Sequence, residues 1–149
     1  MRVKRENLFH LIEPMLPHVE KPSRYLNHEW GAVEEQEGPF HVCMVYADVY
    51  EVGQPNLGIA ILYNALNKAP YISCERAYLP WTDMAALMRK RNVPLLSLEG
   101  AAPLASFDVV GFTLAHEMIA TNIIETLDLA GIPKLSEERD EEDPLIFGG

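Results

Sequence analysis

Cysteine is scarce in this sequence of 149 residues, which contains only Cys43 and Cys74. Two thiolates alone cannot supply the four ligands of a structural zinc site or of an iron–sulfur cluster. Both cysteines lie inside apolar runs typical of strands, where buried free thiols are common. We therefore expect no cysteine-based metal centre and no disulfide bond within this chain.

Basic residues are also few. The chain has 12 Lys and Arg against 22 Asp and Glu, and its formal net charge is −10. Because phosphate binding needs clustered Lys and Arg, this balance argues against a nucleic-acid partner. Much of the negative charge lies in ERDEEDP and the preceding glutamate, where residues 137–143 include six acids. Such a run predicts a solvated loop.

Long apolar runs are absent as well. No stretch approaches the roughly twenty apolar residues that span a membrane. The N-terminal segment MRVKRENLFHLIEPM begins with basic residues, but His10, Glu13 and Pro14 interrupt its apolar part, so it does not resemble a secretory signal. We expect a cytoplasmic protein without a membrane partner.

The common catalytic motifs are missing. The sequence has no G-x-x-x-x-G-K-[ST] phosphate loop, no G-x-G-x-x-G and no G-x-S-x-G elbow. His116 and Glu117 begin HEMIA, which lacks the second histidine of a zinc protease helix. The chain therefore shows no complete catalytic constellation and no metal-ligand set, and it looks more like a binding module than a self-sufficient enzyme.

The hydrophobic pattern predicts strands that alternate with helices. Hydrophobic residues make up 48% of the chain, enough for a proper core. We expect strands at 40–47, 71–78, 93–98, 108–114 and 144–149. We expect helices at 5–16, 57–67, 82–91 and 118–130. Regular alternation implies a mostly parallel sheet with right-handed crossovers.

The sequence therefore predicts a flavodoxin-like, three-layer α/β domain with about five strands. Residues 1–39 are interpreted as an N-terminal helix and an extended arm, and residues 40–149 as the α/β domain. The arm has no regular pattern and is interrupted by Pro22, Gly31, Gly38 and Pro39. A sheet of this kind binds ligands at the carboxyl ends of its strands.

One loop at that edge, ADVYEVG at residues 47–53, is a candidate site. Asp48 and Gly53 follow the first strand, and Asn56 opens the next helix, whose N-terminus can hold an anion or a polar tail. His116 lies at a helix start at the same edge. An ordinary turn between a strand and a helix would use the same residue types, and spacing alone leaves both interpretations open.

Several segments in order resemble a known family. They are FHVCMVYADVYEVGQPNLGIAILYNALN, RAYLPWTDMAALMRKRNVPLLSLE, FDVVGFTL, NIIETLDLAGIP and PLIFGG. Together they are similar to the N-terminal, cobalamin-binding-type, Rossmann-like domain of a family of radical SAM proteins. The resemblance covers about residues 21–149.

The resemblance implies a radical SAM domain in the same polypeptide, with a C-x-x-x-C-x-x-C motif that holds a [4Fe–4S] cluster for cleavage of S-adenosylmethionine. This chain contains no such motif and cannot carry out that reaction alone. We expect it to be a fragment cut after Gly148 and Gly149, before the radical SAM domain.

The resemblance also implies cofactor-binding positions. Cobalamin-binding domains carry D-x-H-x-x-G, S-x-L and G-G, and these correspond here to Asp48 through Gly53, to Thr113 through Ala115, and to Gly148 with Gly149. In the first motif histidine would be the lower cobalt ligand and aspartate would orient it. The hydroxyl of Thr113 and the glycines would line the channel for the nucleotide tail.

Tyr50 stands where that histidine would be. A neutral phenol is a poor substitute for imidazole, so any cobalamin would bind without a histidine below the cobalt. The expected function is therefore an accessory domain that binds a base-off corrinoid or caps the radical SAM barrel. The alternatives are a degenerate, non-catalytic binding module without corrinoid, and a flavodoxin-like enzyme that binds flavin or a nucleotide. The last fits poorly, because no loop rich in Ser and Thr follows the first strand.

Overall fold

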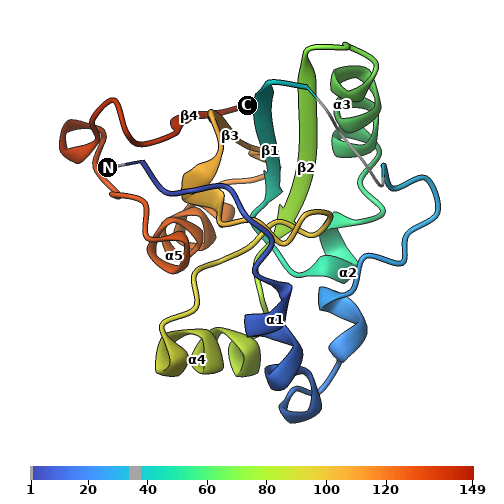
Figure 1. Ribbon diagram of the computed structural model, residues 1–149, viewed down its shortest axis with the longest axis vertical. Coiled ribbons are helices and arrows are strands. Elements are labelled where there is room, and N and C mark those ends of the chain that lie inside the picture. Colours follow the sequence, from blue (N-terminus) through green and yellow to red (C-terminus); the bar gives the residue numbers. More distant parts are fainter. Residues whose placement is uncertain (1, 34–37) are drawn as a thin grey trace.

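The computed structural model describes residues 2–33 and 38–149. These residues form an α/β fold around a four-stranded parallel sheet with the order β2-β1-β3-β4 (Figure 1). The strands are β1 (Phe40–Tyr46), β2 (Ile72–Tyr78), β3 (Val109–Phe112) and β4 (Leu145–Gly148). The expected fold class is confirmed.

The central strand β1 sets the register of the sheet. Val42 pairs with Cys74 of β2 on one side and with Val109 of β3 on the other. Five consecutive residues of β1, from Val42 to Tyr46, are buried. A strand covered on both faces reads as a continuous apolar run, which is why the sequence predicted it well.

The helices follow the strands as right-handed crossovers require. They are α2 (Tyr50–Gly53), α3 (Leu57–Asn67), α4 (Thr82–Arg91) and α5 (Ile119–Ala130). Figure 1 shows α3 on one side of the sheet and α4 and α5 on the other, where α4 and α5 contact each other. The strand order reverses between β1 and β3, so the carboxyl ends of these two strands mark the switch point of the fold.

The N-terminal segment differs from the expected helix at 5–16. Only α1 (Phe9–Ile12) is α-helical, and a 3₁₀ helix, η1 (Glu13–His18), continues it. Pro14 and Pro17 lack the N–H groups that an α-helix needs, so the backbone tightens into shorter turns. The expected arm at 18–39 contains one more 3₁₀ turn, η2 (Pro22–Tyr25), and its residues 34–37 lie outside the described residues.

The expected strand at 93–98 is wrong. The segment makes only an isolated antiparallel bridge between Leu96 and Pro103, and η3 (Leu104–Ser106) follows. Instead of a fifth strand, side chains satisfy the outer edge of β2. The amide of Asn67 bonds both the N–H and the C=O of Cys74, at 2.8 and 3.1 Å. Farther along, the carboxylate of Glu99 accepts from the backbone N–H of Arg76 at 2.7 Å.

These bonds close an edge that would otherwise expose unpaired backbone groups. Among the residues that the structure describes, Leu98 alone bonds this outer edge of β2 through its backbone, with its N–H donating to the carbonyl of Arg76 at 2.7 Å. Because Asn67 and Glu99 occupy the neighbouring positions, a regular strand cannot form there. This explains why an apolar run with strand-like composition does not join the sheet.

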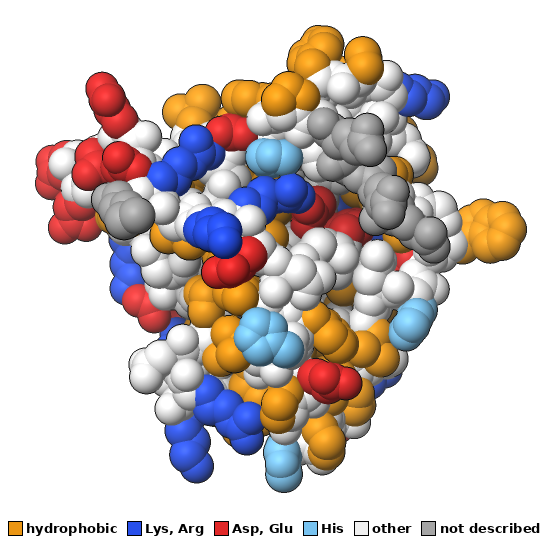
Figure 2. All heavy atoms as spheres, in the orientation of Figure 1, with side chains coloured by type: hydrophobic (Ala, Val, Ile, Leu, Met, Phe, Trp, Pro, Cys, Tyr) orange, Lys and Arg blue, Asp and Glu red, His pale blue; other side chains and the backbone are white. Residues whose placement is uncertain are grey.

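The acidic run lies on the surface, as expected. Glu137, Glu138, Asp140, Glu141 and Glu142 are exposed, around the 3₁₀ helix η4 (Ser136–Glu138). Figure 2 shows this loop as the red group at the left of the molecule. Among the described residues, no helix is long and apolar enough to cross a membrane.

The edge closure by Asn67 is testable. We expect Asn67→Ala to lower the free energy of unfolding by about 1–3 kcal/mol, because it leaves two backbone groups of an edge strand without partners. Urea denaturation of the two proteins measures this. Asn64→Ala is the matched control, since Asn64 lies on the same helix and is exposed. An equal effect of the two substitutions would contradict the role of Asn67.

Candidate functional site

The residues that the sequence singled out lie at or beyond the carboxyl ends of the strands. Those after β1 occupy the turn into α2, α2 itself and the N-cap of α3, and the others follow β3 or end β4. The residues after β1 lie near those after β3, because these two strands are adjacent in the sheet. The backbone N–H of Thr113 donates to the carbonyl of Val45 at 3.1 Å. The structure thus places these residues along one edge: Asp48, Tyr50, Gly53, Asn56, Thr113, Ala115, His116, Gly148 and Gly149.

Asp48 organises the turn after β1. Its side chain accepts from the N–H of Val49 at 2.7 Å. Its backbone carbonyl accepts from the N–H of Leu79 at 2.9 Å, which joins this turn to the end of β2. Asp48 therefore makes local contacts that hold the loop, and it orients no histidine.

Tyr50 packs instead of projecting as a ligand. Its ring meets the ring of Tyr78 edge to face, with centroids 5.5 Å apart, and the residue is half-buried. Gly53 lies in the same contact, because a Cβ there would come within 2.6 Å of the Tyr78 ring and 2.9 Å of the Tyr46 Cβ. The glycine is thus required so that α2 can approach the two tyrosines.

Asn56 acts as the N-cap of α3, as its position predicted. Its side-chain oxygen accepts from the N–H of Ile59 at 3.0 Å. This bond satisfies one of the free N–H groups at the helix start. The contact explains Asn56 without any ligand.

The other half of the edge is more open. Ala115 and His116 are exposed and Thr113 is half-buried. Gly149 closes the loop by donating its N–H to the carbonyl of Phe112 at 3.1 Å and by accepting from Leu114 at 3.0 Å. The side chain of Leu114 lies over Gly148, 3.2 Å from where a Cβ would be.

These residues do not fit a corrinoid ligated by the protein. The ring of Tyr50 packs on the ring of Tyr78, and the side chain of Asp48 accepts a hydrogen bond from its own loop. Leu114 covers Gly148, where a nucleotide tail would need room. In the described part of the chain, no group of three or more His, Cys, Asp or Glu residues is arranged to hold a metal ion. The edge offers a surface rather than a coordination site.

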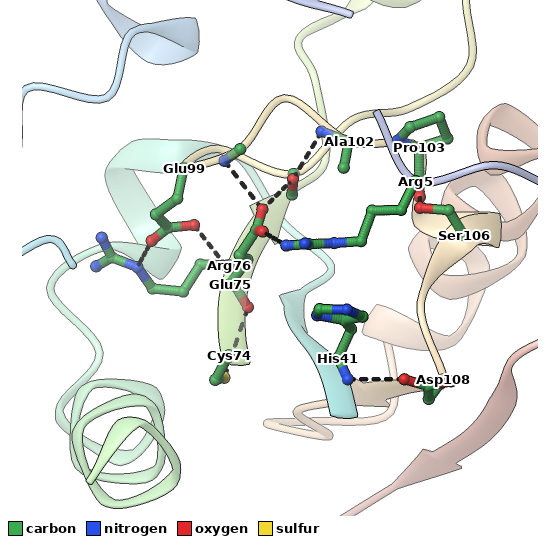
Figure 3. Close-up of polar contacts among 12 residues, drawn as sticks. Arg5, His41, Cys74, Glu75, Arg76, Glu99, Ala102, Pro103, Ser106 and Asp108 are labelled. Atoms are coloured by element: carbon green, nitrogen blue, oxygen red, sulfur yellow. Dashed lines mark hydrogen bonds and ion pairs between the residues drawn. The ribbon is translucent and has the colours of Figure 1, made fainter. Parts of the chain in front are cut away.

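A buried charge network on β2 was not foreseen. Glu75 and Arg76 are 3% and 7% exposed and point to opposite faces of the strand. Glu75 accepts from the guanidinium of Arg5, from the Ser97 hydroxyl and from the Gly100 N–H. Figure 3 shows Glu75 between Arg5 and the pair of Arg76 and Glu99.

The Arg76 side of this network pairs two buried charges. Nε of Arg76 lies 2.7 Å from Glu99 Oε1, and its guanidinium carbon is 4.4 Å from the centre of the Tyr63 ring. Burial raises the pKa of the Glu99 carboxyl, and Arg76 opposes that rise. Two adjacent charged residues inside the expected strand at 71–78 were a signal for this network, but the sequence does not indicate their distant partners.

A second ion-pair group attaches the N-terminal arm to α2. Lys21 Nζ and Arg24 Nε lie 2.7 and 2.9 Å from Glu51 Oε1. The hydrogen bond from Lys21 lowers the pKa of Glu51 from 4.5 to about 2, with Arg24 adding to the effect and burial opposing it. This group fixes the arm beside Tyr50, at the edge of the candidate site.

Comparison with known proteins identifies a family. Residues 58–149, more than half of the chain, match the family described as radical SAM proteins, N-terminal. No curated protein and no solved structure matches the chain. The matched range begins within α3 and includes β2, β3 and β4. Of the candidate site, it includes Thr113, Ala115, His116, Gly148 and Gly149.

The attachment of the arm should depend on pH. Because the pKa of Glu51 is lower in the folded chain, its contribution to stability is full above pH 4.5 and is lost as the pH falls toward 2. We expect Glu51→Gln to be less stable than the parent near neutral pH, and the difference to vanish across that range. Urea denaturation at several pH values measures it. Glu13→Gln, at an exposed residue of η1, should show a difference that does not change in this way.

Proposed function

The chain belongs to the family of N-terminal domains of radical SAM proteins, and on that premise we propose that its carboxyl edge docks on the radical SAM domain of the same polypeptide. Membership makes it an accessory domain of a radical SAM protein. It also places the [4Fe–4S] cluster and S-adenosylmethionine in the parent protein. Both cysteines of this chain are buried inside strands, so the cluster ligands must come from elsewhere.

The observation that carries the proposal is the apolar and open character of this edge. Leu114 is 51% exposed and Met118 81% exposed, and both flank the loop that carries Ala115 and His116. Gly149 is hydrogen-bonded into the same loop. Burial of these large apolar side chains would favour contact with another domain at this edge.

Docking at this edge would give the domain a supporting chemical role. The radical SAM domain supplies the cluster and the radical chemistry when those groups are bound. The loops at this edge would help to exclude water from the mouth of that domain. The domain acts in this proposal by binding and covering, and none of its residues reacts.

Hydrogen exchange tests this proposal. We expect the backbone amides of residues 113–118 and of Gly149 to exchange more slowly in the parent polypeptide than in the 149-residue chain, because docking would bury them. Met118→Asp in the parent should restore fast exchange, since it places a charge in the contact. Mass spectrometry of the two proteins measures both effects.

The opposite end of the sheet provides the control. Tyr71 precedes β2 and is 61% exposed, so Tyr71→Asp should leave exchange at 113–118 unchanged. Slower exchange only around Tyr71, or equal exchange at 113–118 in both proteins, would contradict docking at the carboxyl edge.

Corrinoid binding at the same edge is the second candidate. It is favoured by the spacing of Asp48 and Gly53 and by the position of Thr113 and both C-terminal glycines along one edge. Such binding would need Leu114 to move away from Gly148. Because Tyr50 packs on Tyr78, the corrinoid would be held without a protein histidine below the cobalt.

Spectra of the purified proteins separate the two candidates. If corrinoid binds, the chain or the parent polypeptide mixed with hydroxocobalamin should retain it after desalting, with a base-off spectrum. His116→Ala, which removes the exposed histidine of this edge, should leave that spectrum unchanged. A spectrum that changes in His116→Ala would contradict binding without histidine. If neither protein retains hydroxocobalamin, the corrinoid candidate is wrong and docking is the remaining function of this edge.

A further inference from the structure

A cavity of about 360 Å³ lies at the carboxyl end of β2, where Ala77, Tyr78, Leu79 and Pro80 line it. The N-terminal arm covers it through Arg24 and Asn27, and α4 and the segment 95–101 form its other walls. Of the nine site residues that the sequence suggested, only Tyr50 lines it. Its size is within the range of pockets that hold small molecules.

The greater part of the cavity wall is apolar. Residues from α1, α4 and the segment after it supply methyl, thioether and aromatic groups: Phe9, Ile12, Met84, Met88, Leu95 and Leu96. Such a wall favours a ligand with an apolar or aromatic body, because burial of that body removes it from water.

The remaining wall carries buried polar atoms that have no hydrogen-bond partner within the described residues. They are Nη1 of Arg24, Oδ1 of Asn27 and the hydroxyl of Tyr78. Buried polar groups in proteins are nearly always paired, and an unpaired one is unfavourable. Three such atoms on residues that line one cavity indicate a ligand with both a hydrogen-bond donor and an acceptor.

The charges around the cavity are already balanced. Arg24 is paired with Glu51, and Glu99 with Arg76. A charged ligand would therefore enter a largely apolar space without a free counter-ion, which is unfavourable. A neutral ligand meets no such penalty.

We propose that this cavity binds a small neutral molecule with an aromatic or apolar body and a carboxamide-like polar end. The amide N–H would donate to Asn27, and the amide oxygen would accept from Arg24 and Tyr78. The apolar body would lie against Met84 and Met88 of α4. The site goes beyond docking on a radical SAM domain and does not depend on it.

Methyl NMR of the 149-residue chain with labelled methionines tests the site. The probe is 2-naphthamide, and its charged analogue 2-naphthoate is the matched control. We expect 2-naphthamide to shift the methyl signals of Met84 and Met88, and to leave those of Met44 and Met118 in place. An affinity of about 0.1–1 mM is expected for a probe of this size. The naphthoate should bind about ten-fold more weakly or not at all.

Tyr78→Phe separates binding from folding. The hydroxyl makes no hydrogen bond of good geometry within the described residues, although it lies near the charge of Arg76, so its removal should change thermal stability little. Affinity for 2-naphthamide should fall about ten-fold, because one hydrogen bond to the ligand is lost. Asn27→Leu should act in the same direction as a second variant.

Three results would overturn the proposal. The first is no shift of Met84 or Met88 up to about 10 mM probe, a concentration at which even weak pockets fill. The second is equal affinity for the amide and the carboxylate. The third is unchanged affinity in both Tyr78→Phe and Asn27→Leu. None of these results depends on the radical SAM domain. The docking proposal is tested separately, by hydrogen exchange.

Discussion

The adjacent pair Glu75 and Arg76 imposes the main constraint on this fold. Both are almost fully buried in an edge strand, and burial of an unpaired charge would be strongly unfavourable. Each therefore needs its own set of partners on its own face. Arg5 from the N-terminal segment and the loop at 97–100 serve Glu75, while Glu99 serves Arg76. Two distant segments are thereby brought to the same strand.

The shape of the loop after residue 96 follows from these partners. Gly100 must lack a side chain, because a Cβ there would lie 2.8 Å from the Glu75 oxygens. Ala101 has a left-handed backbone with φ of 45°, which is uncommon for a residue with a side chain. Its carbonyl accepts from the N–H of Leu8 at 2.8 Å and so holds the N-terminal segment. The loop therefore pairs two buried charges and does not form a regular strand.

The same constraint explains which parts of the fold were predictable. The strands and α3, α4 and α5 have local signals: apolar runs, the N-cap at Asn56 and the left-handed C-cap at Gly131. The segment 93–98 carries an equally apolar run, but Glu99 takes the backbone position that a fifth strand would use. That competition arises between residues far apart in the chain, and periodicity contains no information about it.

The candidate site was also predictable only in part. Sequence spacing predicted that its residues share one edge of the sheet, because parallel strands bring their carboxyl ends together. It could not show that Tyr50 and Gly53 are explained by packing on Tyr78, a residue 25 or more positions away. The loop keeps the spacing of a corrinoid motif, whereas its contacts are those of a packed turn.

The cavity beside β2 and the edge closure have a common origin. A fifth strand would continue the sheet past β2, and its side chains would occupy the space next to Tyr78 and Leu98. Because the edge is closed by Asn67, Glu99 and a single backbone bond from Leu98, that space is bounded by α4 and the arm instead. Ion pairs of Lys21 and Arg24 with Glu51 of α2 fix the arm there. The polar closure of β2 and the apolar cavity therefore lie side by side, because Leu98 and Glu99 take part in both.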